Sequence, residues 1–137
     1  MPAQLVAIAV LAAGCAGPEH RAIIGTWKSD AARTLASMRE VVDVPQQVRA
    51  AFENDYHGHL VVEYRADTVR AYFDDGNYDS GYQPYEVVEV TDDYVVTREW
   101  NEVLAQFSDS TTYLDGECIY GVSAEYQYRE YFCPLAN

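Results

Sequence analysis

The strongest constraint on the fold is a series of turn signals that divides the second half of the chain into short segments of alternating polarity. The signals fall at nearly regular spacing, at Ala66-Asp67, Asp75-Gly76, Asp92-Asp93, Asp115-Gly116 and Glu125-Tyr126. Asp-Gly pairs between alternating segments are strong indicators of β-hairpins. From His59 onward the sequence therefore predicts an antiparallel meander of about seven or eight strands.

The alternation around Ala66-Asp67 also predicts which side chains share a face. A reversal there aligns alternate residues of the two flanking segments, namely Leu60, Val62, Tyr64, Val69, Ala71 and Phe73. A meander of this kind usually hides its edges by closing into a barrel. The fold class expected is mainly β, a small closed barrel, and Val62, Tyr64, Val69 and Phe73 are candidate ligand-lining residues if its interior is open.

One or two short helices are expected before the meander. Asp30 to Glu40 has a capping residue, Ser29 or Asp30, followed by an apolar stripe of Ala32, Leu35, Ala36 and Met38. Pro45 suits a first helical turn and opens a second segment to about Asn54, in which Val48, Ala51 and Phe52 are the residues expected to be buried.

The N-terminus resembles the signal sequence of bacterial lipoproteins. Leu5 to Ala13 is apolar throughout, and Leu11, Ala12, Ala13 and Gly14 precede Cys15 as a lipobox precedes the cysteine that becomes lipidated. Ala12 stands where Leu is usual, and residues 1–4 contain no Lys or Arg. The alternative is an ordinary signal peptide without lipidation. We expect a signal peptide over 1–14, a lipidated Cys15 and tether over 15–22, and a barrel domain over 23–137.

The remaining cysteines, Cys118 and Cys133, suit an oxidising compartment. A reversal at Glu125-Tyr126 places them directly opposite one another on neighbouring strands, within the distance that a disulfide spans. We expect that they form a disulfide, the alternative being two free thiols in a cytosolic barrel.

Gly25, Thr26 and Trp27 match the Gly-x-Trp signature of lipocalins, and the chain resembles small bacterial lipoproteins with a lipocalin-like, calycin-type domain. The resemblance implies that Trp27 closes one barrel end with Arg129 of the last strand laid over its ring. A third family signature, Thr-Asp-Tyr, is matched imperfectly by Thr91 to Tyr94, and two helices follow the first strand where lipocalins have none. Gly25, Trp27 and Arg129 are thus predicted to be structural.

Charge and motifs exclude several function classes. The formal net charge of −13 disfavours nucleic acid and anionic lipid surfaces as partners, and is compatible with a cationic protein partner. No nucleophile motif, phosphate loop or Cys-x-x-Cys is present, so we expect neither an enzyme nor a cofactor. His57 and His59, with Asp55, are weak candidates for a metal site, whereas His20 falls in the expected tether.

Two functions fit these expectations. The first is a lipid-anchored binding protein on the periplasmic face of the outer membrane, which holds a small apolar or amphipathic ligand or serves envelope maintenance. The second is an acidic protein without a ligand cavity that inhibits a cationic enzyme attacking the envelope, such as lysozyme. The tyrosines, all at Tyr56 or later, could line a cavity, form an adhesive surface or simply stand half-buried on strands.

Overall fold

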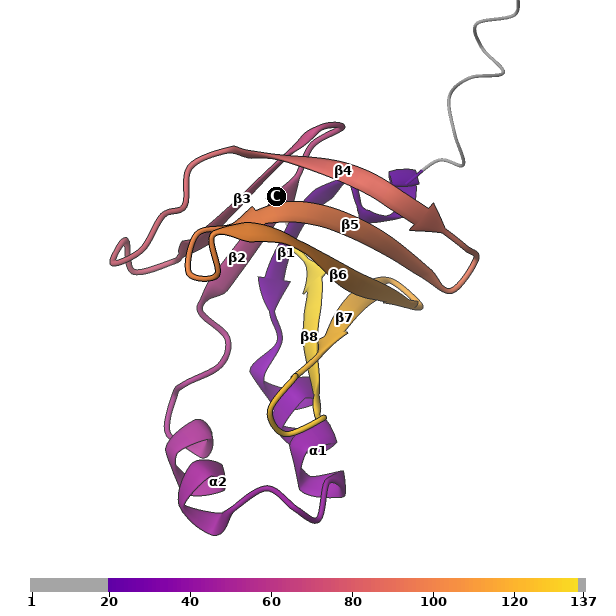
Figure 1. Cartoon of the computed structure of the whole chain (residues 1–137). Helices are drawn as coiled ribbons and strands as arrows, with labels where there is room; N and C mark the ends of the chain where they lie inside the picture. The colour runs from indigo at the N-terminus through magenta and orange to yellow at the C-terminus, as the bar shows by residue number, and fades with distance from the viewer. Residues whose placement is uncertain (1–19, 136–137) are drawn as a thin grey trace, which may run out of the picture.

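The computed structural model describes residues 20–135, which form a closed antiparallel barrel with a helical part at one end (Figure 1). A 3-10 helix, η2 (His20–Ile23), leads into the first strand. The strands pair in chain order and the last closes on the first; they are β1 (Gly25–Ser29), β2 (Leu60–Tyr64), β3 (Thr68–Phe73), β4 (Gln83–Val90), β5 (Tyr94–Asn101), β6 (Gln106–Asp115), β7 (Cys118–Val122) and β8 (Arg129–Pro134). The predicted barrel meander is confirmed.

Two helices, α1 (Ala31–Glu40) and α2 (Gln46–Glu53), lie between β1 and β2, as expected. Asp30 caps α1, because its side chain accepts a hydrogen bond from the Arg33 N–H. The buried side of α1 differs from the predicted stripe, since Thr34 and Met38 are buried whereas Ala32 and Ala36 are exposed. The reason is that the Thr34 hydroxyl accepts a hydrogen bond from the Tyr131 N–H, which turns this side of α1 toward β8.

The helical part has its own small core, separate from the barrel. Met38 and Val44 are buried against Tyr128, with Phe52 and Tyr126 packed around them. Of the residues expected to be buried in α2, Val48 and Phe52 are half-buried and Ala51 is exposed. Within residues 20–135, no helix has both the length and the hydropathy needed to cross a bilayer.

Most predicted turns are where the sequence places them. The reversals at Ala66-Asp67, Asp92-Asp93 and Glu125-Tyr126 match the observed registers, whereas the β6–β7 turn is centred on Gly116-Glu117, one residue later than predicted. The β3–β4 connection is longer than a hairpin, because Thr68 pairs with Pro84 and Asp75-Gly76 is a turn within it. A further turn between Asn101 and Gln106 was not predicted.

The start of the described chain is not a simple tether. Residues 20–22, expected to belong to one, are in η2, and Ile23 at its end is fully buried. His20 Nε2 lies 2.9 Å from the Ala66 carbonyl oxygen, and its ring packs edge-on to Tyr85. This segment covers one end of the barrel. Cys15, the predicted lipidation site, and the rest of the predicted signal sequence lie outside the described residues.

The Cys118–Cys133 disulfide is present, with a Cα–Cα separation of 4.3 Å. Ile119 pairs with Phe132, so position 118 lies directly opposite 133, as the predicted reversal requires. The bond joins β7 to β8 beside α1, where Arg33 Nη1 lies 3.6 Å from Cys133 Sγ. It thereby fastens the last two strands together at the place where the barrel closes.

Candidate functional site

The inward face of the barrel follows from the strand registers. Trp27 pairs with Val62 and Val62 with Ala71, so these three residues share one face, and the pair Tyr64 and Val69 lies on the same face two residues away. The predicted face of the β2–β3 hairpin is therefore the inner one. Residues of the other strands that continue this face include Tyr85, Val95, Thr97, Glu99, Ser110, Thr112, Ile119 and Phe132.

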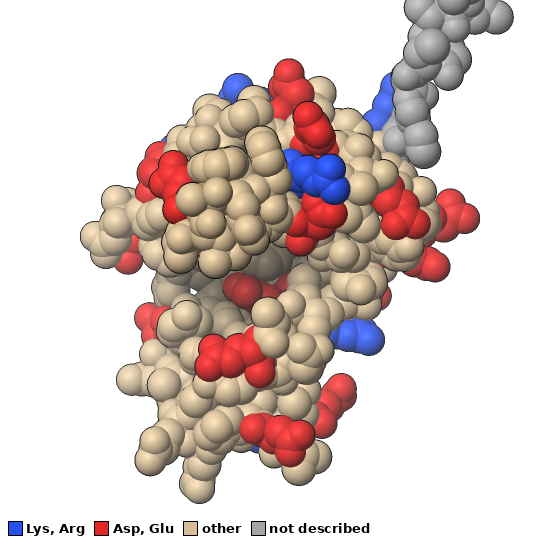
Figure 2. Space-filling view, in the orientation of Figure 1, with Lys and Arg blue, Asp and Glu red and all other residues tan. Residues whose placement is uncertain are grey.

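Two adjoining cavities occupy the interior, with volumes of about 560 Å³ and about 640 Å³. Both are lined by Val62, Tyr64 and Ser110, which places their junction between β2 and β6. Figure 2 shows the molecule hollowed between the barrel and the helical part, with acidic side chains inside the hollow. Each volume is within the range of about 300 to 1,000 Å³ that is typical of sites for small molecules.

The first cavity combines an apolar side with a hydroxyl side. Val62, Ile119 and Phe132 supply apolar surface, and Ser110 and Thr112 of β6 supply hydroxyl groups. These two residues alternate along β6 and point inward, opposite Thr97 and Val95 of β5. The cavity is therefore amphipathic, which suits a ligand with both an apolar body and a polar group.

The second cavity has apolar surface from Val69 and Ala71 and carboxylates from Glu99 and Glu102. Of the predicted ligand-lining residues, Val62 and Tyr64 line both cavities and Val69 lines this one. Phe73 lines neither. It pairs with Leu60 on the predicted face, is 39% exposed, and borders a smaller cavity beside His57.

Glu99 is half-buried on β5, directly opposite Tyr85 of β4. Burial raises the pKa of its carboxyl group above the ordinary value. Burial raises the pKa of Tyr64 and that of Tyr85 to about 12 each. The negative charge of Glu99 adds to both shifts, after that of Asp67 in the case of Tyr85. No ion pair to Glu99 is formed by any residue that the structure describes.

Thr97, the preceding inward residue of β5, is fully buried. Its hydroxyl is close enough to Glu99 to moderate the rise in the pKa of that carboxyl group, but within the described chain it makes no hydrogen bond of normal length and angle. A buried hydroxyl without a partner is uncommon and costs free energy. Thr97 and Glu99 thus share the inward face of β5, but Glu99 lines the second cavity whereas Thr97 lines neither.

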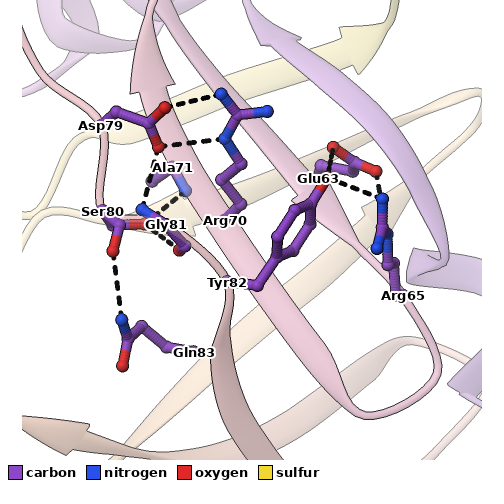
Figure 3. Close-up of polar contacts among 9 residues, drawn as sticks. All are labelled: Glu63, Arg65, Arg70, Ala71, Asp79, Ser80, Gly81, Tyr82 and Gln83. Atoms are coloured by element: carbon purple, nitrogen blue, oxygen red, sulfur yellow. Dashed lines mark hydrogen bonds and ion pairs between the residues drawn. The ribbon is translucent and has the colours of Figure 1, made fainter.

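The β3–β4 connection, which lines the second cavity, is held in place by a network of polar contacts (Figure 3). Arg70 donates two hydrogen bonds to Asp79, at 3.0 and 2.6 Å, and lowers the pKa of that carboxyl group to about 2. Ser80 Oγ accepts a hydrogen bond from the Ala71 N–H. Beside this network, the Tyr82 hydroxyl accepts from Arg65 and donates to Glu63. One wall of the second cavity is therefore a loop that these hydrogen bonds and the Arg70–Asp79 ion pair hold in place.

Trp27 closes the covered end of the barrel, but without Arg129. Trp27 is 8% exposed and its indole N–H donates a 2.8 Å hydrogen bond to the Ile23 carbonyl oxygen. Gly25 before it adopts a φ of +147°, a conformation that favours glycine. Arg129 lies over the Tyr120 ring, 4.6 Å from its centre. The predicted Arg129–Trp27 contact is wrong, because Trp27 pairs with Pro134, five residues along β8 from Arg129.

The weak metal candidates do not converge. His57 is buried beside Tyr128 and Glu130, whereas His59 is partly exposed and contacts Asp55 and Asp74 with its two ring nitrogens, at 3.0 and 3.1 Å. Both histidines precede β2, which begins at Leu60, rather than lying within a strand. Among residues 20–135, no group of three or more potential ligands is arranged around a common metal position.

The residues that sequence reasoning missed are Thr97, Glu99, Ser110 and Thr112. Ser108, Ser110 and Thr112 alternate along the sequence, and this alternation could have indicated a strand face. That face could not be predicted without the turn after Asn101, which pairs β6 with β5.

Comparisons with protein-family models, with curated proteins and with solved structures give no match.

Proposed function

We propose that this protein is a binding protein that holds one small amphipathic molecule inside its barrel. The observation that carries the proposal is the pair of adjoining cavities with apolar surface on one side and hydroxyl or carboxylate groups on the other. Burial of the apolar part of a ligand against Val62, Val69 and Ile119 supplies the driving force, and the polar groups set its orientation.

An extracytoplasmic location accompanies this proposal. The Cys118–Cys133 disulfide supports it, because such bonds persist in oxidising compartments. The resemblance of residues 11–15 to a lipobox leads us to propose a lipid anchor at Cys15 on the periplasmic face of the outer membrane. Replacement of Cys15→Ser is then expected to leave an unprocessed precursor without the acyl mass, and normal processing of this variant would refute the anchor.

The alternative, an acidic inhibitor of a cationic enzyme, needs only a complementary surface and gains nothing from a hollow interior. The net charge of −13 fits it, but the two cavities favour the binding protein. Salt-sensitive binding to lysozyme, together with no uptake of a small molecule, would reverse this preference.

A cavity-filling variant tests the proposal. Ser110 lines both cavities, so Ser110→Trp places a large side chain at their junction. Titration with the neutral fluorescent probe N-phenylnaphthylamine is expected to show saturable binding at one site in the unmodified protein and at least about tenfold weaker binding in Ser110→Trp. Val88→Trp is the matched control, because Val88 is exposed and lines neither interior cavity. No saturable binding, or equal binding in all three proteins, would overturn the proposal.

A further inference from the structure

The charged side chains that line the two interior cavities, among the described residues, are all acidic. Neither interior cavity is lined by Lys, Arg or His among the residues that the structure describes, whereas Glu99, Glu102 and Asp79 line one cavity and Asp109 lines the other. A carboxylate or phosphate on a ligand would therefore meet carboxylates and no cation among the lining residues that the structure describes. This lining selects against anionic ligands such as fatty acids.

Two of these carboxylates, Glu99 and Glu102, form no ion pair within residues 20–135, whereas the other two are paired. Asp79 is paired with Arg70 at 2.6 Å and Asp109 with Arg98 at 2.8 Å, so the charges at the two cavity rims are already compensated. Glu99 is more deeply placed than Glu102 and forms no ion pair within residues 20–135. A half-buried carboxylate is costly unless a partner compensates it.

Thr97 lies beside Glu99 on β5 but lines neither cavity. It is fully buried, its hydroxyl has no hydrogen-bond partner among the described residues, and it shares the inward face of β5 with Glu99. Its cross-strand neighbour is Ser110, which lines both cavities. A ligand in the second cavity therefore reaches Glu99 and Ser110 directly, whereas Thr97 lies behind this surface.

We infer that the ligand is an amphipathic primary amine, whose ammonium group is held by the Glu99 carboxylate. This inference rests on the proposed function, since it names the class of molecule that the cavity takes. An ammonium group supplies three N–H donors and one positive charge, and so matches a cavity-lining carboxylate that has no cation among the described residues. The apolar part of the ligand lies against Val62, Val69 and Tyr64, which border the same cavity.

Three probes with the same alkyl chain separate the contributions of charge and of apolar burial. Decylamine, decanol and decanoate, each below its micelle concentration, are titrated into the protein by calorimetry at neutral pH. Decylamine is expected to bind roughly tenfold to a hundredfold more tightly than decanol, as a charge-assisted hydrogen bond allows, and decanoate most weakly.

Glu99→Gln removes the charge while retaining the shape of the side chain. It is expected to reduce decylamine affinity to about that of decanol and to leave decanol binding unchanged within about threefold. Glu117→Gln is the matched control, because it makes the same change in net charge at an exposed turn that lines neither interior cavity. Thr97→Val provides a second variant, with a smaller loss expected for decylamine.

Equal affinities for decylamine and decanol, or no effect of Glu99→Gln beyond that of Glu117→Gln, would overturn the inference while leaving the proposed function intact. Preferential binding of decanoate would also overturn it. Absence of binding by all three probes would instead remove the proposed function. Thermal unfolding of each variant shows whether a loss of binding reflects a loss of fold.

Discussion

Glu99 on β5 lies directly opposite Tyr85 on β4, on the inward face of the barrel, and its charge adds to the rise that burial causes in the pKa of Tyr85. Tyr85 is 6% exposed and its hydroxyl donates a hydrogen bond to the Arg65 carbonyl oxygen, so it offers Glu99 no donor. The described residues therefore supply Glu99 with no cation, and the nearby Thr97 hydroxyl only moderates the rise in its pKa. Such a feature is typical of groups retained for binding rather than for stability.

Glu99→Gln is expected to stabilise the protein at neutral pH, by on the order of 1 kcal/mol. Because burial raises the pKa of Glu99, the unfolded chain loses this proton first as pH rises, and the folded state is progressively destabilised between the ordinary and the raised pKa. The gain in the variant should thus be absent at acid pH and complete above the raised pKa. Urea unfolding as a function of pH, with Glu117→Gln as control, measures it; a loss of stability at neutral pH would contradict the explanation.

Thr97→Val is expected to increase the stability of the unliganded barrel by about 1 kcal/mol, because it removes a buried hydroxyl that has no partner and keeps the side chain's shape. Denaturant unfolding of the two proteins, without ligand, provides the comparison. Thr112→Val is a useful contrast, since Thr112 is buried on the neighbouring strand. A destabilisation by Thr97→Val would show that the hydroxyl is already satisfied.

Loss of the Cys118–Cys133 disulfide is expected to cost roughly 3 kcal/mol, because the bond restricts a loop of 15 residues in the unfolded chain. The double replacement Cys118→Ser, Cys133→Ser, compared with the oxidised protein by urea unfolding, tests this. Thiol titration of denatured protein from an oxidising compartment, with and without reductant, checks that the bond forms there. Equal thiol counts in the two samples would exclude it.

Arg129→Ala is expected to leave the fluorescence of Trp27 unchanged, since Arg129 stacks on Tyr120 and Trp27 lies at the other end of the β1–β8 pairing. The loss in stability should be about 0.5 to 1 kcal/mol, as for an exposed cation–π contact. The measurement uses a Trp100→Phe background, so that Trp27 is the remaining tryptophan. A shift in its emission on removal of Arg129 would restore the contact implied by the lipocalin resemblance.

His59 is expected to make the stability pH-dependent near neutrality. Hydrogen bonds to Asp55 and then Asp74 raise its pKa in the folded state above 6.5. The stabilisation is therefore complete below the unfolded pKa and is lost as pH rises through the raised value. The thermal midpoint of the unmodified protein should fall over this interval relative to that of His59→Asn. Parallel pH profiles for the two proteins would contradict the assignment.

The sequence predicted the barrel because alternation and turn chemistry agree in its second half. Around Ala66-Asp67 the two signals fix the same register, and a two-residue turn leaves little freedom for a slip. The turn after Asn101 escaped prediction because its residues, Glu102 to Ala105, include exposed Val103 and Leu104 and no Gly or Pro. Ala105 adopts a φ of +50° there without the residue type that usually signals it.

The candidate site was only partly predictable for the same reason. Val62, Tyr64 and Val69 follow from the β2–β3 alternation alone. Glu99 and Ser110 become neighbours of that face only when β5 and β6 are paired through the missed turn and the barrel is closed. Arg129 was misplaced because the length of β8 and its stagger against β1 are tertiary properties, set by the Trp27–Pro134 pairing. The family resemblance that suggested the contact stays a prediction.

Native mass spectrometry of the purified protein, followed by denaturing extraction, tests the central claim most directly. We predict that the protein carries, or takes up from added decylamine, one small molecule per chain, and that Ser110→Trp, which fills the junction of the two cavities, does not. A spectrum that shows only the bare chain at saturating probe, or the same bound mass in Ser110→Trp, would contradict a ligand inside the barrel.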